Sequence, residues 1–159
     1  MSFDQPDIGT IDGSRFSCLI VAASYNSTLA DTLLARTVER LTASGMPSDQ
    51  IEVLRVPGSN EVPYAIQLGI ETGNFDVCIG LGVLIRGDTI HYNVIAQSAG
   101  DALQTVALKN RTPVVNGILV AENLEQAEHR IIGDVNRGSE FAECALQLAS
   151  LRKEREAAK

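Results

Sequence analysis

The 159 residues carry a formal charge of −7, from 13 lysines and arginines against 20 aspartates and glutamates. This length supports one domain with one sizeable core, and a composition with 45% hydrophobic and 21% charged residues excludes a disordered chain. Because the balance is acidic and the basic residues are scattered, nucleic acid and anionic membrane surfaces are poor candidates as partners.

The three cysteines, Cys18, Cys78 and Cys144, are widely spaced and set among apolar residues. An odd number in such surroundings favours free thiols in a reducing compartment over disulfides. The first residues lack the basic and apolar regions of a signal peptide, and no apolar run approaches membrane-spanning length. We therefore expect a cytoplasmic protein that does not enter a membrane.

Apolar patterning predicts alternating strands and helices behind an N-terminal arm. Residues 1–14, rich in glycine, aspartate and serine, are predicted to form the arm, and residues 15–159 a single domain. The expected elements are, in chain order, a strand over 16–23, a helix over 28–44 capped by Ser27 or Thr28, a strand over 51–56, a helix over 60–71, a strand over 76–85, a helix over 91–109, a strand over 113–120, and helices over 124–132 and 138–155. Residues 152–159 are expected to be a solvated, frayed end.

Strands that alternate with helices predict a parallel sheet covered on both faces. Right-handed crossovers then favour a three-layer, flavodoxin-like α/β sandwich whose four strands have the order 2-1-3-4. In that order the chain reverses direction between the first and third strands. The crevice at this point is where open α/β sheets bind ligands.

The third strand ends in the most informative stretch of the chain. An apolar run to Ile85 is followed by Arg86, Gly87, Asp88, Thr89 and, one residue further, His91. The backbone N–H of Gly87 and the Thr89 hydroxyl can donate to an anion, especially if Thr89 opens the next helix. The imidazole of His91 is a natural proton carrier near neutral pH, although a lone histidine is more often a helix cap or a packed side chain.

Two other strand ends carry polar or aromatic residues. The second strand is followed by Pro57-Gly-Ser-Asn-Glu61, in which Ser59 and Glu61 can satisfy the first turn of a helix, or Glu61 can accept hydrogen bonds from a polyol. Tyr25, after the first strand, is either a surface aromatic or a stacking platform. Arg130 follows acidic residues on a short helix, and its spacing alone favours a solvated helix face.

Gly80, Gly82 and Gly87 loosely match a dinucleotide-binding fingerprint. Their spacing is wrong, and no acidic residue ends the second strand to hold a ribose. Glycines inside a strand instead indicate close approach by another backbone or a flat ligand.

Four motifs together resemble the 6,7-dimethyl-8-ribityllumazine synthase family. They are Ala23-Ser-Tyr-Asn26, Val56-Pro-Gly-Ser-Asn-Glu-Val-Pro63, Gly82-Val-Leu-Ile-Arg-Gly-Asp-Thr-Ile-His-Tyr92, and Asn116-Gly-Ile-Leu-Val-Ala-Glu-Asn-Leu-Glu-Gln-Ala127 with Arg130. They occur in order over about residues 16–151. The resemblance implies a transferase that condenses 5-amino-6-ribitylaminouracil with 3,4-dihydroxy-2-butanone 4-phosphate, with release of phosphate and water, in riboflavin biosynthesis and with no cofactor and no metal.

The resemblance also assigns roles to individual residues. It implies that Tyr25 stacks on the pyrimidine, that the ribityl chain is held at residues 59–61, and that His91 moves protons. The substrate-binding residues would be Tyr25, Asn26, Ser59, Asn60, Glu61, Val83, Leu84, Ile85 and Asn116. The phosphate-binding residues would be Gly87, Asp88, Thr89 and Arg130, of which Arg130 is also catalytic together with His91.

In this family the site lies between neighbouring subunits of a pentamer, and some members assemble pentamers into a hollow shell. The resemblance therefore implies a homopentamer in which Asn116 and Arg130 come from the neighbour. Asn60 and Asn116 stand where the family often has an aromatic residue, so this pocket is more polar. Those replacements keep two alternatives open, a lumazine- or riboflavin-binding protein without catalysis and a purely structural shell protein.

Overall fold

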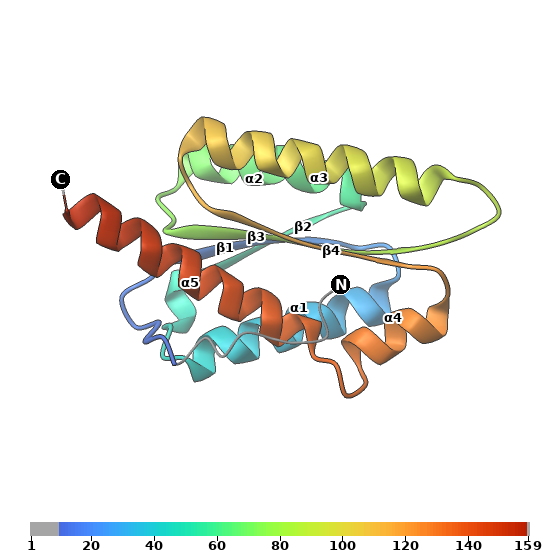
Figure 1. The fold of residues 1–159 in the computed structure, drawn as a ribbon, viewed down its shortest axis with the longest axis horizontal. Coiled ribbons are helices and arrows are strands. Elements are labelled where there is room, and N and C mark those ends of the chain that lie inside the picture. Colours follow the sequence, from blue (N-terminus) through green and yellow to red (C-terminus); the bar gives the residue numbers. More distant parts are fainter. Residues whose placement is uncertain (1–9, 159) are drawn as a thin grey trace.

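The computed structural model describes residues 10–158 (Figure 1). Strands and helices alternate along the chain as the sequence predicts, with small shifts of the bounds. They are β1 (Cys18–Ala23), α1 (Ser27–Ala43), β2 (Ile51–Val56), α2 (Val62–Thr72), β3 (Val77–Ile85), α3 (His91–Asn110), β4 (Val114–Ala121), α4 (Leu124–Ile131) and α5 (Arg137–Ala157). Short 3-10 turns at Ser48–Gln50 and Ser59–Glu61, which were not predicted, precede β2 and α2.

The strands form one parallel sheet with the order β2-β1-β3-β4. Helices α2 and α3 cover one face of it, and α1, α4 and α5 cover the other (Figure 1). This arrangement confirms the predicted three-layer, flavodoxin-like sandwich. Because the chain reverses direction between β1 and β3, the carboxyl ends of these two central strands lie beside each other, and loops from both faces of the sheet meet there.

Apolar side chains fill the space on both faces of the sheet. On one face Ile20 and Ile79 belong to a buried cluster with Leu33 of α1, and on the other Val21 packs in a cluster with Leu103 of α3. All five of these side chains are fully buried. Burial of each such side chain stabilises the fold by about 1.5–3 kcal/mol. Because helices pack on both faces of the sheet in this way, the positions of the strand ends are fixed.

Gly80 and Gly82 of β3 make room for the side chains of neighbouring residues. The sequence instead predicts that another backbone or a flat ligand approaches them. A Cβ at Gly80 would lie 2.8 Å from Cγ1 of Val62, and a Cβ at Gly82 would collide with the Ser59 hydroxyl. The absence of a side chain at these positions therefore lets the start of α2 approach the sheet closely. It also fixes the turn that carries Ser59 against β3.

The prediction that Ser27 or Thr28 caps α1 is wrong. The N-cap is Asn26, with φ 54° and ψ 50°, and its side chain makes no capping hydrogen bond. The chain turns from β1 into α1 within a few residues, and the left-handed conformation of Asn26 provides that turn. The helix can then begin directly at Ser27.

The expectation of a solvated, frayed C-terminus is also wrong in part. Helix α5 continues to Ala157, and Arg152 donates to the backbone oxygens of Phe75 and Asp76 at 3.0 and 3.2 Å. The ammonium of Lys153 lies 2.8 Å from the carboxylate of Asp76. These contacts attach the last turns of α5 to the start of β3, whereas residues 154–158 are exposed.

Most of the predicted arm lies outside the described residues. Within the described part, Ile11 packs half-buried against the core, and the backbone N–H of Gly13 donates to the Ser44 carbonyl at 2.7 Å. The boundary at residue 15 stays a prediction. Among residues 10–158 there is no helix of sufficient length and hydropathy to cross a bilayer.

Candidate active site

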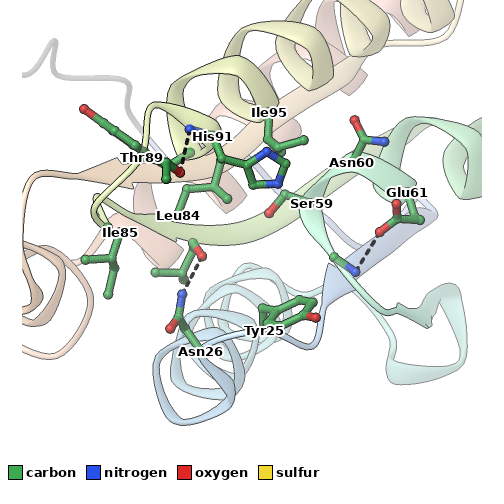
Figure 2. Close-up of a pocket in the computed structure, with 14 residues that line it drawn as sticks. Tyr25, Asn26, Ser59, Asn60, Glu61, Leu84, Ile85, Thr89, His91 and Ile95 are labelled. Atoms are coloured by element: carbon green, nitrogen blue, oxygen red, sulfur yellow. Dashed lines mark hydrogen bonds between the residues drawn. The ribbon is translucent and has the colours of Figure 1, made fainter.

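A pocket of about 600 Å³ opens at the carboxyl ends of β1, β2 and β3. It lies at the reversal point that the sequence predicts, and side chains from all three strand ends face it (Figure 2). Its lining consists of Tyr25, Asn26, Gly58, Ser59, Asn60, Glu61, Val83, Leu84, Ile85, Gly87, Thr89, His91, Tyr92 and Ile95.

The loop after β1 supplies an aromatic surface. Tyr25 is 72% exposed, and its ring lies beside the backbone of Gly58, where an added Cβ would come within 3.5 Å of Cδ2. Just before it, the Ser24 hydroxyl donates to the Val56 carbonyl at 2.9 Å, which ties this loop to the end of β2. An exposed ring held over a pocket offers one face to a flat ligand.

The turn between β2 and α2 supplies hydroxyl, amide and carboxylate groups. Glu61 accepts the backbone N–H of Gly58 through Oε2 at 2.9 Å, so it closes the first turn as the sequence suggests. Its other oxygen remains available to a ligand. Ser59 is buried beside β3, and Asn60 is exposed at the rim (Figure 2). This turn can therefore hold a chain of hydroxyl groups.

The end of β3 and the start of α3 form the remaining wall. Val83, Leu84 and Ile85 line the pocket, and an added Cβ at Gly87 would meet no atom within 4 Å, so the loop is open at this point. Thr89 lies in the loop and does not open the helix. Its hydroxyl instead accepts the backbone N–H of His91, the first residue of α3, at 3.4 Å.

The imidazole of His91 is directed into the pocket between Ser59 and Ile95 (Figure 2). The side chain is exposed, so it can exchange protons with a bound molecule and with water. The open loop that precedes it carries the Thr89 hydroxyl, which accepts the His91 N–H and can still donate its own proton, and the backbone N–H groups of residues 87–89. Such a combination of an anion-binding loop and a proton carrier suits a reaction in which an anionic group leaves.

Arg86 turns away from the pocket, although the sequence groups it with the site. Its guanidinium lies 3.0 Å from the carboxylate of Glu122, and its backbone N–H donates to the Ala121 carbonyl at 2.9 Å. The hydrogen bond to Glu122 raises the pKa of Arg86, and the charges of Tyr92 and Glu122 add to this effect. Arg86 therefore fastens the loop before α3 to the end of β4.

Three of the predicted site residues lie outside this pocket. Asp88 is exposed in the loop. Asn116 lies in the middle of β4, paired with Gly80, and its side-chain oxygen accepts the N–H of Ile118 at 3.1 Å. Arg130 lies on α4, which covers the opposite face of the sheet from α3 (Figure 1). One chain alone does not bring Asn116 or Arg130 to His91.

Three lining residues were not among the predicted ones. Gly58 belongs to the turn after β2, and its lack of a side chain makes room for the Glu61 carboxylate, because an added Cβ would lie 2.9 Å from Oε2 of Glu61. Tyr92 and Ile95 lie near the start of α3. Ile95 stands four residues after His91, so helical spacing places it on the same side, a signal that the sequence did contain. Residues 10–158 include no group of three or more histidines, cysteines or acidic residues placed to hold a metal ion.

Comparisons with known proteins show the family of this chain. A family model described as 6,7-dimethyl-8-ribityllumazine synthase matches residues 15–153. Three relatives are named 6,7-dimethyl-8-ribityllumazine synthase. Those from Polaromonas sp. strain JS666, Paracidovorax citrulli and Xanthomonas oryzae pv. oryzae are 37%, 36% and 39% identical to this chain. The aligned regions cover 91%, 95% and 87% of this chain and 92%, 96% and 89% of the respective relatives. The chain thus belongs to the 6,7-dimethyl-8-ribityllumazine synthase family of enzymes.

Proposed function

We propose that this protein condenses 5-amino-6-ribitylaminouracil with 3,4-dihydroxy-2-butanone 4-phosphate to give 6,7-dimethyl-8-ribityllumazine, phosphate and water. The observation that carries the proposal is the pocket itself. An aromatic platform, a polyol-binding turn, an open anion-binding loop and an imidazole line one cavity in a chain that belongs to the synthase family. The step belongs to riboflavin biosynthesis.

The uracil substrate occupies the side of the pocket between Tyr25 and the end of β3. Its flat ring stacks on Tyr25 and faces the backbone of residues 83–85, with Asn26 at the inner end. The ribityl chain extends along the turn after β2, where Ser59, Asn60 and the free oxygen of Glu61 meet its hydroxyl groups. The polar character of this turn supports the placement.

The butanone phosphate occupies the side of the pocket near α3. Backbone N–H groups of residues 87–89 and the hydroxyl of Thr89 hold its phosphate. The amino group of the uracil attacks the ketone, water leaves, and a Schiff base forms. Neutral His91 accepts the proton of the attacking amine, and its protonated form assists departure of the phosphate. Ring closure with loss of water gives the lumazine.

A neighbouring copy of the chain completes the site in a homopentamer. Ile90, Val94 and Val120 are 76%, 53% and 43% exposed. Ile90 precedes α3 directly, Val94 lies in α3, and Val120 lies in the edge strand β4. Apolar exposure beside an open sheet edge suits a subunit contact. This contact brings Arg130 to the phosphate of the adjacent pocket and Asn116 to its ribityl end. With its free cysteines, such an assembly suits the cytoplasm.

The test is to mix the purified protein with both substrates and to follow the absorbance and fluorescence of the lumazine. We expect both substrates to be required and phosphate to be released in equal amount to the lumazine. A protein that binds lumazine or riboflavin but forms neither product would instead be a binding protein on this fold. Assembly without binding would indicate a structural shell protein.

A further inference from the structure

Asn26 combines an unusual backbone with an unusual use of its side chain. Within residues 10–158 only Asn26 and Arg111 are non-glycine residues with positive φ, both at 54°. Asparagine tolerates this left-handed conformation better than most residues. The side chain does not cap the helix that follows it, so its hydrogen-bonding groups serve another purpose.

The side-chain amide of Asn26 donates through Nδ2 to the backbone carbonyl of Val83 at 2.9 Å. Because a carbonyl oxygen can only accept, the nitrogen of the amide must face it. The pairing of β1 with β3 ends at Ala22 and Leu81, although β3 continues to Ile85. Asn26 thus provides a hydrogen-bond donor to β3 beyond the point where β1 stops.

This bond joins two opposite walls of the pocket (Figure 2). Tyr25 precedes Asn26 directly, and Val83 begins the stretch of β3 that lines the pocket. Tyr25 is largely exposed, so burial does not hold its ring in place. Gly58 supports it on one side, and the backbone at Asn26 determines where the ring sits relative to β3.

We propose that Asn26 is a positioning residue, whose amide sets the width of the slot between the Tyr25 ring and the end of β3. The identity of the bound ring rests on the proposed function, but the coupling of the two walls does not. This role differs from a direct contact between the Asn26 side chain and the pyrimidine, because one N–H of the amide is used by Val83 in the ligand-free protein.

The test substitutes Asn26→Asp, which keeps the shape and tolerates the left-handed backbone but replaces the donor by an acceptor. Arg111→Asp is the matched control, since it places the same residue in the same backbone conformation at the end of α3, away from the pocket. Asn26→Gly, which keeps the backbone and removes the amide, serves as a second variant if the aspartate variant folds poorly.

Two measurements are made on each variant. Hydrogen exchange of the ligand-free protein reports on segments 24–29 and 82–87, where we expect faster exchange in Asn26→Asp and in Asn26→Gly only. Fluorescence titration with 6,7-dimethyl-8-ribityllumazine should show ~10-fold weaker binding. In Asn26→Asp the loss should shrink relative to wild type as the pH falls toward about 4, because a protonated carboxyl group can donate to Val83 again.

Weaker binding with unchanged exchange would overturn the proposal and indicate direct contact between Asn26 and the ligand. Unchanged binding would overturn it as well, since the bond would then not set the slot. Equal effects in Arg111→Asp would also overturn it, because the loss would then come from a general loss of stability and not from the bond to Val83. If wild type bound no lumazine, the proposed function would fail, and the exchange data alone would decide whether the walls are coupled.

Discussion

His91 is the residue at which the proposed chemistry converges. It opens α3, its backbone N–H is held by Thr89, and its imidazole faces the cavity. The nucleophile of the reaction is an amine of the substrate, so the protein needs no nucleophile of its own. Much of the acceleration should then come from holding two reactants together, with His91 adding proton transfer.

We expect His91→Ala to fold and bind phosphate but to form lumazine about 10²–10⁴-fold more slowly. A measurable residual rate should remain, because the two substrates are still held together. His129→Ala is the control, since His129 is exposed on α4 outside the pocket. Steady-state formation of lumazine measures both variants. An unchanged rate in His91→Ala, or a covalent adduct trapped on His91, would contradict this role.

Arg130 is expected to act on phosphate. Arg130→Ala should weaken binding of butanone phosphate and of inorganic phosphate, because a hydrogen bond to a charged group is worth about 1.5–3 kcal/mol. Arg130→Lys should recover only part of the loss, since the planar guanidinium is missing. Calorimetric titration measures the binding, with Arg155→Ala, an exposed position near the end of α5, as control. Normal phosphate binding with loss of uracil binding would refute the assignment.

For single residues, two features of the sequence predicted the site: the chemistry of the side chain and its position after a strand. Tyr25, Glu61 and His91 could be predicted to line a site because they follow strand ends and carry groups that recognise ligands. The bond from Asn26 to Val83 could not, because it spans 57 residues and depends on where β1 stops pairing.

Among the elements, the contact between α5 and the start of β3 includes one carboxylate that also binds Ser17, directly before β1. Asp76 accepts the backbone N–H of Ser17 at 2.9 Å, its hydroxyl at 3.1 Å and the ammonium of Lys153 at 2.8 Å. Burial raises the pKa of Asp76, but the hydrogen bonds and charge of Lys153 and the donors of Ser17 outweigh it, so the pKa lies below the ordinary 3.8. The ionised form therefore stabilises the fold.

The sign of this shift predicts an acid-sensitive contact. A carboxyl group whose pKa is lowered by folding stabilises the protein fully above the unfolded value of roughly 4 and loses that contribution as the pH falls through the folded value. Asp76→Asn should lower the free energy of unfolding by about 1–3 kcal/mol near neutral pH. Urea denaturation measures the free energy of unfolding of both proteins, and we expect the difference between them to shrink from neutral to acidic pH. If the difference in free energy of unfolding did not change with pH, the ionised carboxylate of Asp76 would not be its cause.

The elements themselves were predictable because each has its own periodic pattern and break. The helix start at Asn26 and the attachment of α5 were not. A left-handed N-cap follows from the tight turn between β1 and α1, and Arg152 finds its acceptors at residues 75 and 76 only after the sheet has formed.

For the whole molecule, the alternation of strands and helices predicted the layers, and right-handed crossovers predicted the strand order. The strand order in turn predicted where a pocket would form. The site could be predicted only as far as one chain contains it. Gly87, Thr89 and His91 meet in the described pocket, whereas Asn116 and Arg130 lie elsewhere in the same chain. The proposed reaction therefore requires a second copy of the chain.

Mixed assemblies test this shared site most directly. His91→Ala and Arg130→Ala chains, each with a different tag, are co-expressed, the assemblies carrying both tags are isolated, and lumazine formation is measured. If His91 and Arg130 of one site come from two neighbouring chains, random mixing restores about a quarter of the sites. We expect activity far above that of either variant alone. Activity no higher than the mean of the two variants would contradict the shared site.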